Sequence, residues 1–194
     1  NFNGTAMDIF VLTHEAGHAF QVYRSRNFPW NEYNWPTLEA CEIHSMSMEF
    51  LTWPWMERFF GDDADKFRYM HLAKALLFLP YGVAVDEFQH HVYAHPEEGP
   101  EARAQAWTRI AKRYMPESDY EGNAYLESGR LWQAQGHIIE SPFYYIDYTL
   151  AQVCAFQFWN KAEDDRNAAM ADYVRLCDAG GSRPFLHLVD YAGL

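Results

Sequence analysis

The segment His14-Glu15-Ala16-Gly17-His18 constrains the fold of this chain more than any other part of the sequence. Residues i and i+4 share one face of an α-helix, so His14 and His18 can reach a single metal ion if the segment is helical. Two histidines at this spacing bind Zn²⁺, and Glu15 can then take a proton from the attacking water. The pattern is typical of zinc hydrolases that cleave peptide bonds.

The residues around this motif also favour a helix that is packed against other parts of the protein. Apolar residues flank it, and Thr5 with Asp8 predicts an N-cap pair at the start of the helix. Gly17 costs about 1 kcal/mol relative to alanine inside a helix. It suits the close approach of another backbone or of a substrate, and the alternative is a flexible residue with no packing role.

A catalytic zinc ion needs a third protein ligand and one open position. The candidates in the next segment are Glu39, Glu42 and His44. Glu39, Glu42 and Glu49 share roughly one face of a second helix, whereas His44 points elsewhere and is expected to be packed or hydrogen-bonded. Spacing alone leaves the choice between Glu39 and Glu42 open.

These two segments resemble the thimet oligopeptidase and oligoendopeptidase F family. That family has a His-Glu-x-Gly-His helix, followed by a second helix whose glutamate is the third zinc ligand, with another glutamate about seven residues later. Glu42 and Glu49 of the run Glu42-Ile43-His44-Ser45-Met46-Ser47-Met48-Glu49 match that pair. The resemblance implies one Zn²⁺ per chain held by His14, His18 and Glu42, with Glu49 and Glu39 orienting the ligand histidines.

The later part of the chain resembles the same family. His137 and the run Pro142-Phe143-Tyr144-Tyr145-Ile146-Asp147-Tyr148 look like its histidine and tyrosine-rich helix, which closes over the substrate. The resemblance implies that His137 and Tyr148, with Tyr144 or Tyr145, stabilise the oxyanion, because a phenol hydroxyl is a neutral hydrogen-bond donor. The alternative is that these tyrosines only pack between helices.

The resemblance implies an all-α fold in which residues 1–194 form a single helical catalytic domain. Family members are much longer, so we expect this chain to be a fragment of a longer enzyme that needs the missing N-terminal region to complete the cleft. A hydrophobic content of 49% and an aromatic content of 18% exclude disorder and provide for a sizeable core.

Charge and cysteine content narrow the partners and the compartment. A net charge of −12 argues against nucleic acid as a partner, and no polybasic segment is available for anionic membranes. No apolar stretch reaches about 18 residues, so no membrane span is expected. The three cysteines are scattered without a CxxC pair, and a reducing cytoplasm is the simplest location.

Helical periodicity runs through the whole chain, and no alternating strand pattern of useful length is present. We expect a kink at Pro54 and a break or kink around Pro80. His71, His95 and His187 are isolated and receive no role. The expected helices span about residues 5–26, 37–60, 64–79 with its continuation to 94, 101–114, 124–134, 142–161, 163–178 and 184–192.

The sequence thus predicts a zinc endopeptidase that hydrolyses internal bonds of short or unfolded oligopeptides. Glu15 would take the water proton and later deliver it to the leaving amine. One alternative is a zinc carboxypeptidase of similar fold, which needs a cation for the substrate's terminal carboxylate; Arg130 is the only candidate near His137. Another is a non-catalytic peptide-binding fragment that retains the zinc site.

Overall fold

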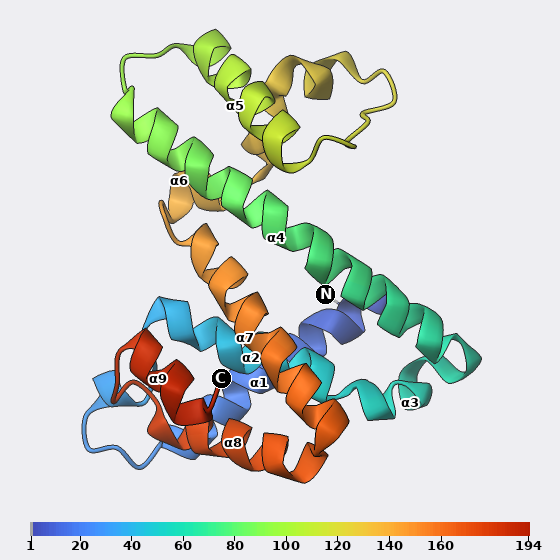
Figure 1. Cartoon of the computed structure of the whole chain (residues 1–194), viewed down its shortest axis with the longest axis vertical. Helices are drawn as coiled ribbons and strands as arrows, with labels where there is room; N and C mark the ends of the chain where they lie inside the picture. Colours follow the sequence, from blue (N-terminus) through green and yellow to red (C-terminus); the bar gives the residue numbers. More distant parts are fainter. Residues whose placement is uncertain (1) are drawn as a thin grey trace. The chain divides into compact units, whose positions relative to one another are not determined.

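The computed structural model describes residues 2–194, and within that range the fold is all-α, as predicted, with no strand (Figure 1). Short 3-10 and π turns connect the α-helices or extend them. The α-helices are α1 (Ala6–Ser25), α2 (Leu38–Leu51), α3 (Glu57–Phe60), α4 (Ala64–Ala94), α5 (Pro100–Tyr114), α6 (His137–Glu140), α7 (Tyr145–Asp164), α8 (Arg166–Ala179) and α9 (Phe185–Ala192). None of these helices is long and apolar enough to cross a membrane.

The chain divides into two compact units. Unit 1 contains the residues up to Lys74 and those from Leu150 to Leu194, and unit 2 contains Ala75–Thr149. Helices α4 and α7 contribute residues to both units.

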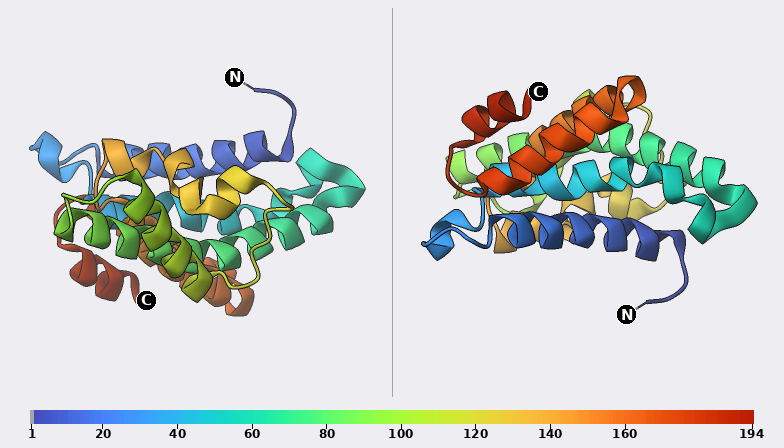
Figure 2. Two further views of the ribbon diagram at one scale, coloured as in Figure 1. Left: turned by 90° about the horizontal axis from the view of Figure 1, so that it is seen from above. Right: turned by 90° about the horizontal axis from the view of Figure 1, so that it is seen from below.

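In unit 1, α1 packs along α2 and α8, and α9 contacts both α8 and α2 (Figure 2). The predicted N-cap pair is present at the start of α1. The Asp8 carboxylate accepts the backbone N–H groups of Thr5 at 2.7 Å and Asn3 at 3.0 Å. These hydrogen bonds, with Thr5 the largest contributor, lower the pKa of Asp8. The cap fixes where the helix that carries the histidine motif begins.

Gly17 sets the distance between α1 and α2. A Cβ atom at this position would lie 2.6 Å from both the His44 carbonyl oxygen and the Ser45 Cα, which belong to the α2 backbone. The Tyr173 hydroxyl of α8 donates a hydrogen bond to the same carbonyl at 2.8 Å. The predicted close approach of another backbone is confirmed, and the interpretation of Gly17 as a merely flexible residue is wrong.

Two helix boundaries differ from the expectation, and both involve proline. The helix expected over residues 37–60 ends at Leu51 and is followed by a 3-10 turn, Trp53–Trp55, and then by α3. Pro54 has no N–H group and disfavours helical backbone at the residue before it. Around Pro80, where a break or a kink was expected, there is no break, because α4 continues through it as one helix of 31 residues. Buried side chains beyond Pro80, such as Phe88, anchor the helix and override local propensity.

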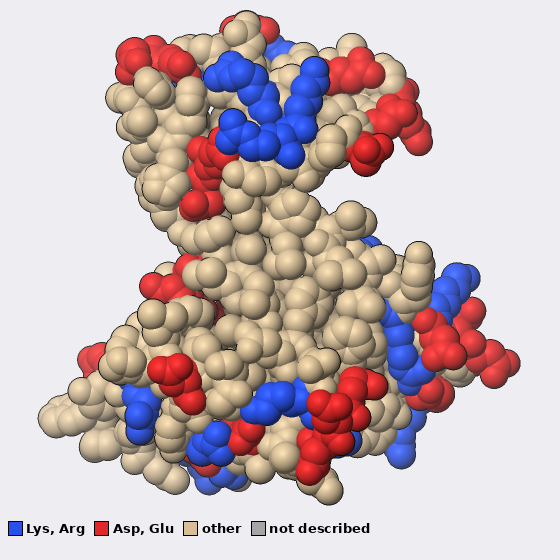
Figure 3. All heavy atoms as spheres, in the orientation of Figure 1, with Lys and Arg blue, Asp and Glu red and all other residues tan. Residues whose placement is uncertain are grey.

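Unit 2 has its own core, formed by α4, α5 and the segment from η5 (Leu131–Ala134) to α7. α5 is amphipathic: it buries Trp107 and Ile110, while Lys and Arg side chains gather on its outer face (Figure 3). The short helix expected over residues 124–134 consists of a π turn, Leu126–Arg130, followed by η5. Gly129 lies inside the π turn with a φ of 82°, which explains why one regular helix does not form.

Candidate metal centre

His14, His18 and Glu42 direct their side chains to one point in unit 1. The Nε2 atoms of His14 and His18 lie 3.2 and 3.3 Å from Oε2 of Glu42. Among residues 2–194, they form the one group of at least three His, Cys, Asp or Glu side chains that is close enough to hold a metal ion. Glu39, which spacing had left as an equal candidate, does not belong to this group.

The spacing of these donors fits a small tetrahedral cation. Ligands at about 2.0–2.1 Å from Zn²⁺ in a tetrahedral site are about 3.3 Å apart. The two distances to Glu42, 3.2 and 3.3 Å, match that separation. Two imidazoles and one carboxylate also form a common ligand set of catalytic zinc sites, which leave a fourth position open.

Neighbouring side chains of α2 hold Glu42 in place. The Ser45 hydroxyl donates a hydrogen bond to Oε2 of Glu42 at 2.9 Å, and the Cys41 thiol lies 3.6 Å from Oε1. Glu42 is buried with 4% of its surface exposed. A buried carboxylate needs such donors or a cation to offset its lost hydration.

Glu49 holds the other ring nitrogen of His14. Its Oε1 lies 2.6 Å from Nδ1 of His14, so the expected contact of Glu49 with a histidine of the motif is present. Burial lowers the pKa of His14, but hydrogen bonds and charge from Glu42 and Glu49 outweigh it and raise the pKa to about 9. A metal ion at this site would have to displace a proton from the imidazole, as is usual for histidine ligands.

His71, to which the sequence analysis gave no role, is hydrogen-bonded to Glu49 and so is linked to His14 through it. Its Nε2 lies 2.9 Å from Oε2 of Glu49, and the Trp53 Nε1–H donates to its Nδ1 at 2.8 Å. His71 lies in α4 and Glu49 in α2, so no helical spacing relates them. No signal in the sequence could have identified this contact.

His44 has the surroundings that the sequence suggested, and Glu15 is accessible to solvent. Glu15 follows His14 on α1 and is exposed, which leaves its carboxylate accessible to water. His44 is fully buried, and its Nδ1 lies 3.3 Å from the Cys41 carbonyl oxygen. Burial lowers the pKa of His44 to about 4, so this residue is a neutral, packed histidine and not part of the donor group.

Comparison with known proteins identifies relatives of this chain. The profile of peptidase family M3 matches residues 1–194. The chain belongs to peptidase family M3. It is 26% identical, over 96% of its length, to an oligoendopeptidase F homolog of Borreliella burgdorferi.

Solved structures resemble this M3 chain over its whole length. A structure of PZ peptidase A with an inhibitor is 63% identical with a TM-score of 0.97. A protein provisionally named oligoendopeptidase F is 68% identical, also with a TM-score of 0.97. The chain covers 32% of the Borreliella burgdorferi protein and 34% of each solved chain, so it spans about a third of their length.

The second predicted group of the M3 chain lies in unit 2. The His137 ring centroid lies 5.2 Å from that of Tyr145, 5.7 Å from that of Tyr148 and 6.2 Å from that of Tyr144. The side-chain amide nitrogen of Gln135 lies 2.6 Å from Nδ1 of His137. The structure therefore brings all four predicted residues of this segment together.

The two candidate partners of Tyr148 differ in burial. Tyr145 belongs to the core of unit 2, packed between Phe78 and Tyr81, and burial raises its pKa. Tyr144 is half-buried, and its ring lies 4.9 Å from that of Tyr148.

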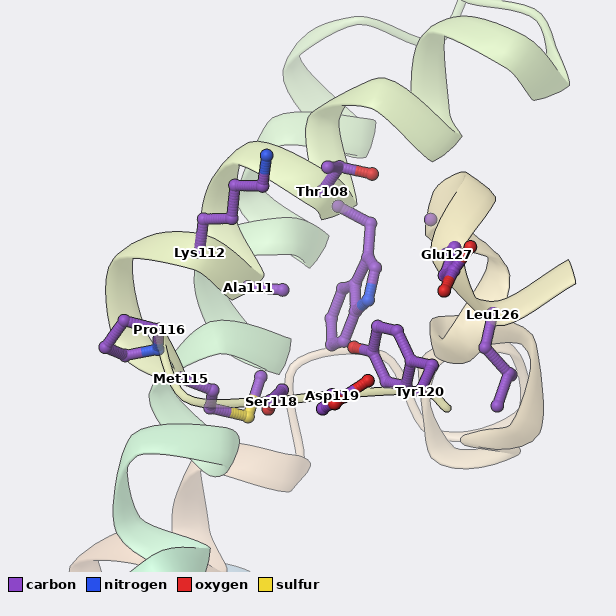
Figure 4. A pocket seen from close by; sticks show the side chains of 12 residues that line it. Thr108, Ala111, Lys112, Met115, Pro116, Ser118, Asp119, Tyr120, Leu126 and Glu127 are labelled. Carbon is purple, nitrogen blue, oxygen red and sulfur yellow. The ribbon is translucent and has the colours of Figure 1, made fainter. Parts of the chain in front are cut away.

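Unit 2 also contains a cavity of about 270 Å³ that the sequence did not suggest. In Figure 4, side chains of α5 such as Thr108 line it together with Tyr120 and Glu127 from the segment that follows the helix. His137 and its three neighbouring tyrosines are not among its lining residues.

Proposed function

We propose that this M3 chain is part of a zinc-dependent endopeptidase that hydrolyses internal bonds of short or unfolded peptides. His14, His18 and Glu42 hold one Zn²⁺. The observation that carries the proposal is the convergence of both Nε2 atoms on Glu42, with Glu49 holding His14 through its other nitrogen. Membership of a peptidase family and the oligoendopeptidase names of the relatives support it.

The acid–base chemistry falls to Glu15. Zinc, when bound, supplies polarisation of the scissile carbonyl and lowers the pKa of water. Glu15 accepts the proton of the attacking water and then transfers it to the leaving amine. Its exposure on α1, directly after His14, allows the carboxylate to reach both water and peptide.

Oxyanion stabilisation falls to His137 and Tyr148. The phenol O–H of a tyrosine and the N–H of an imidazole are hydrogen-bond donors. Held in position in advance, they stabilise the negative charge that develops on the carbonyl oxygen. Tyr144 is the better second tyrosine, because Tyr145 is buried in the core of unit 2. Tyr145 then supports the rings of His137 and Tyr148, which it contacts.

We further propose that residues 1–194 act as a single catalytic domain within a longer cytoplasmic protein. The relatives are about three times as long as the matched region, and their remaining parts would supply the rest of the peptide cleft. A carboxypeptidase is disfavoured, because Arg130 is already paired with Glu101 at 2.8 Å.

The test uses the longest natural form of the protein and an internally quenched peptide blocked at both ends. We expect cleavage at an internal bond, loss of activity with a chelator and recovery with zinc, and one zinc ion at the three donors by anomalous scattering at the zinc edge. A carboxypeptidase would leave the blocked peptide intact but would remove residues from a peptide with a free C-terminus. A binding protein would cleave neither peptide.

A further inference from the structure

Trp53 determines which nitrogen of His71 carries the proton. An indole N–H can only donate a hydrogen bond, and the Trp53 Nε1 lies 2.8 Å from Nδ1 of His71. Nδ1 must therefore accept, so His71 is neutral with its proton on Nε2. A doubly protonated His71 would place two N–H groups against each other.

Glu49 connects His71 to His14 through its two carboxylate oxygens. The Nε2–H of His71 donates to Oε2 of Glu49 at 2.9 Å, and the carboxylate can only accept. Oε1 of Glu49 lies 2.6 Å from Nδ1 of His14 and must accept there as well. Nδ1 of His14 therefore carries a proton. This leaves the lone pair of Nε2 available to a metal ion bound together with His18 and Glu42.

Aromatic rings and burial hold His71 in this orientation. Its ring stacks on Phe50 at 4.5 Å and meets Phe10 edge-on at 5.1 Å. His71 and Glu49 are only 1% and 2% exposed, and hydrogen bonds in such surroundings are stronger than in water. Arg68 donates to the Trp53 carbonyl at 2.7 Å, which fixes the turn that carries the indole.

We propose that His71 is a positioning residue for the metal centre: with its proton held on Nε2 by Trp53, it orients Glu49, and Glu49 orients His14. The inference rests on the proposed function for the presence of a metal at His14, His18 and Glu42. The competing explanation is a histidine that only fills the core between α1, α2 and α4, and it predicts loss of stability without a specific loss of metal affinity.

Zinc affinity separates these explanations, because it is measured without peptidase activity. The His71→Phe variant keeps a ring and removes both hydrogen bonds, and a chelator competition should give a zinc Kd about 10- to 100-fold weaker than wild type. The matched control is Met56→Ala, which removes buried packing from the neighbouring core of unit 1 without removing a hydrogen bond to the centre. It should unfold more easily and keep the wild-type Kd. Equal Kd values for His71→Phe and wild type, or an equal loss in Met56→Ala, would overturn the proposal.

A second measurement keeps the proposal testable if His71→Phe does not fold. In ¹⁵N-histidine NMR spectra of the protein, His71 should show its proton on Nε2, and Trp53→Phe should weaken that preference and raise the zinc Kd by several-fold. A wild-type His71 protonated on Nδ1 would overturn the inference. If the wild-type protein binds no divalent metal, both the proposed function and the inference are overturned. If it binds zinc with a Kd that neither His71→Phe nor Trp53→Phe changes, the inference alone is overturned.

Discussion

The two candidate groups of this chain hold their histidines in opposite ways. In unit 1, His14 lies between the carboxylates of Glu42 and Glu49, at 3.2 and 2.6 Å. In unit 2, His137 contacts the amide of Gln135 and a cluster of tyrosine rings. Carboxylates beside an imidazole favour a cation, whereas amide and phenol groups provide neutral donors for a negative charge. The contrast is consistent with the proposal of cation binding for the unit 1 group and of oxyanion stabilisation for the unit 2 group.

The two groups also differ in how firmly geometry defines each role. In unit 1, a donor-only indole and acceptor-only carboxylates fix the direction of each hydrogen bond from Trp53 to His14. In unit 2, the contacts of His137 with Tyr144, Tyr145 and Tyr148 are ring contacts, which have no donor or acceptor direction. The role proposed for His14 therefore follows from hydrogen bonding, while those proposed for Tyr148 and Tyr144 follow from the family resemblance.

The largest expected effect separates metal binding from chemistry within unit 1. Replacing Glu15 by Gln removes the proton acceptor without touching the three donors, so turnover should fall by about 10²–10⁴-fold. Zinc content should stay at the wild-type level, because Glu15 is not one of the three donors. Peptide hydrolysis and metal analysis of the same preparation provide the check, and a variant that loses its metal would show that Glu15 has been given the wrong role.

The next prediction tests the chemistry assigned to unit 2. Tyr148→Phe deletes one hydroxyl and keeps the ring, so kcat should fall by about 10²–10³-fold with KM and zinc content little changed. Tyr145→Phe is the matched control, because its buried ring should contribute packing and not a hydrogen bond to the substrate. If kcat stays unchanged in Tyr148→Phe, Tyr148 only packs between helices, and Tyr144 becomes the next donor to test.

A third prediction concerns the third ligand in unit 1. Glu42→Ala should weaken zinc binding by more than the roughly 10–100-fold typical of losing an indirect partner, because it removes a donor. Glu39→Ala should have a much smaller effect, since Glu39 lies outside the donor group. A chelator competition titration ranks the two variants, and the reverse order would transfer the ligand role to Glu39.

The smallest expected effect concerns the packing that brings the donors together. Gly17→Ala places a Cβ 2.6 Å from backbone atoms of α2, which should lower the free energy of unfolding by about 1–3 kcal/mol and weaken zinc binding by separating α1 from α2. Gly136→Ala is the control, because no surrounding atom lies closer than 3.8 Å to its added Cβ. Denaturant unfolding of both variants gives the comparison, and equal stabilities would contradict the role of Gly17.

Much of the fold could be predicted because hydrophobic periodicity and capping residues are local. The predicted helix over residues 5–26 corresponds to α1, and that over 163–178 to α8. The predictions were less accurate at the two prolines. A kink was expected at Pro54, and the helix instead ends at Leu51 and is followed by a 3-10 turn, whereas a break or a kink was expected around Pro80 and α4 continues as one helix. Proline removes one N–H donor at either position, and the packing of the surrounding segment decides whether the helix ends there.

The helical period alone identified the pair His14 and His18, because two residues four apart share a helix face whatever the rest of the chain does. It could not choose between Glu39 and Glu42, since both share a face of one helix. That choice required the register of α2 against α1, which the contact of Gly17 with His44 and Ser45 sets. His71 depended on tertiary structure completely, because its bond to Glu49 joins α4 to α2 and no local spacing encodes which buried donor meets a buried carboxylate.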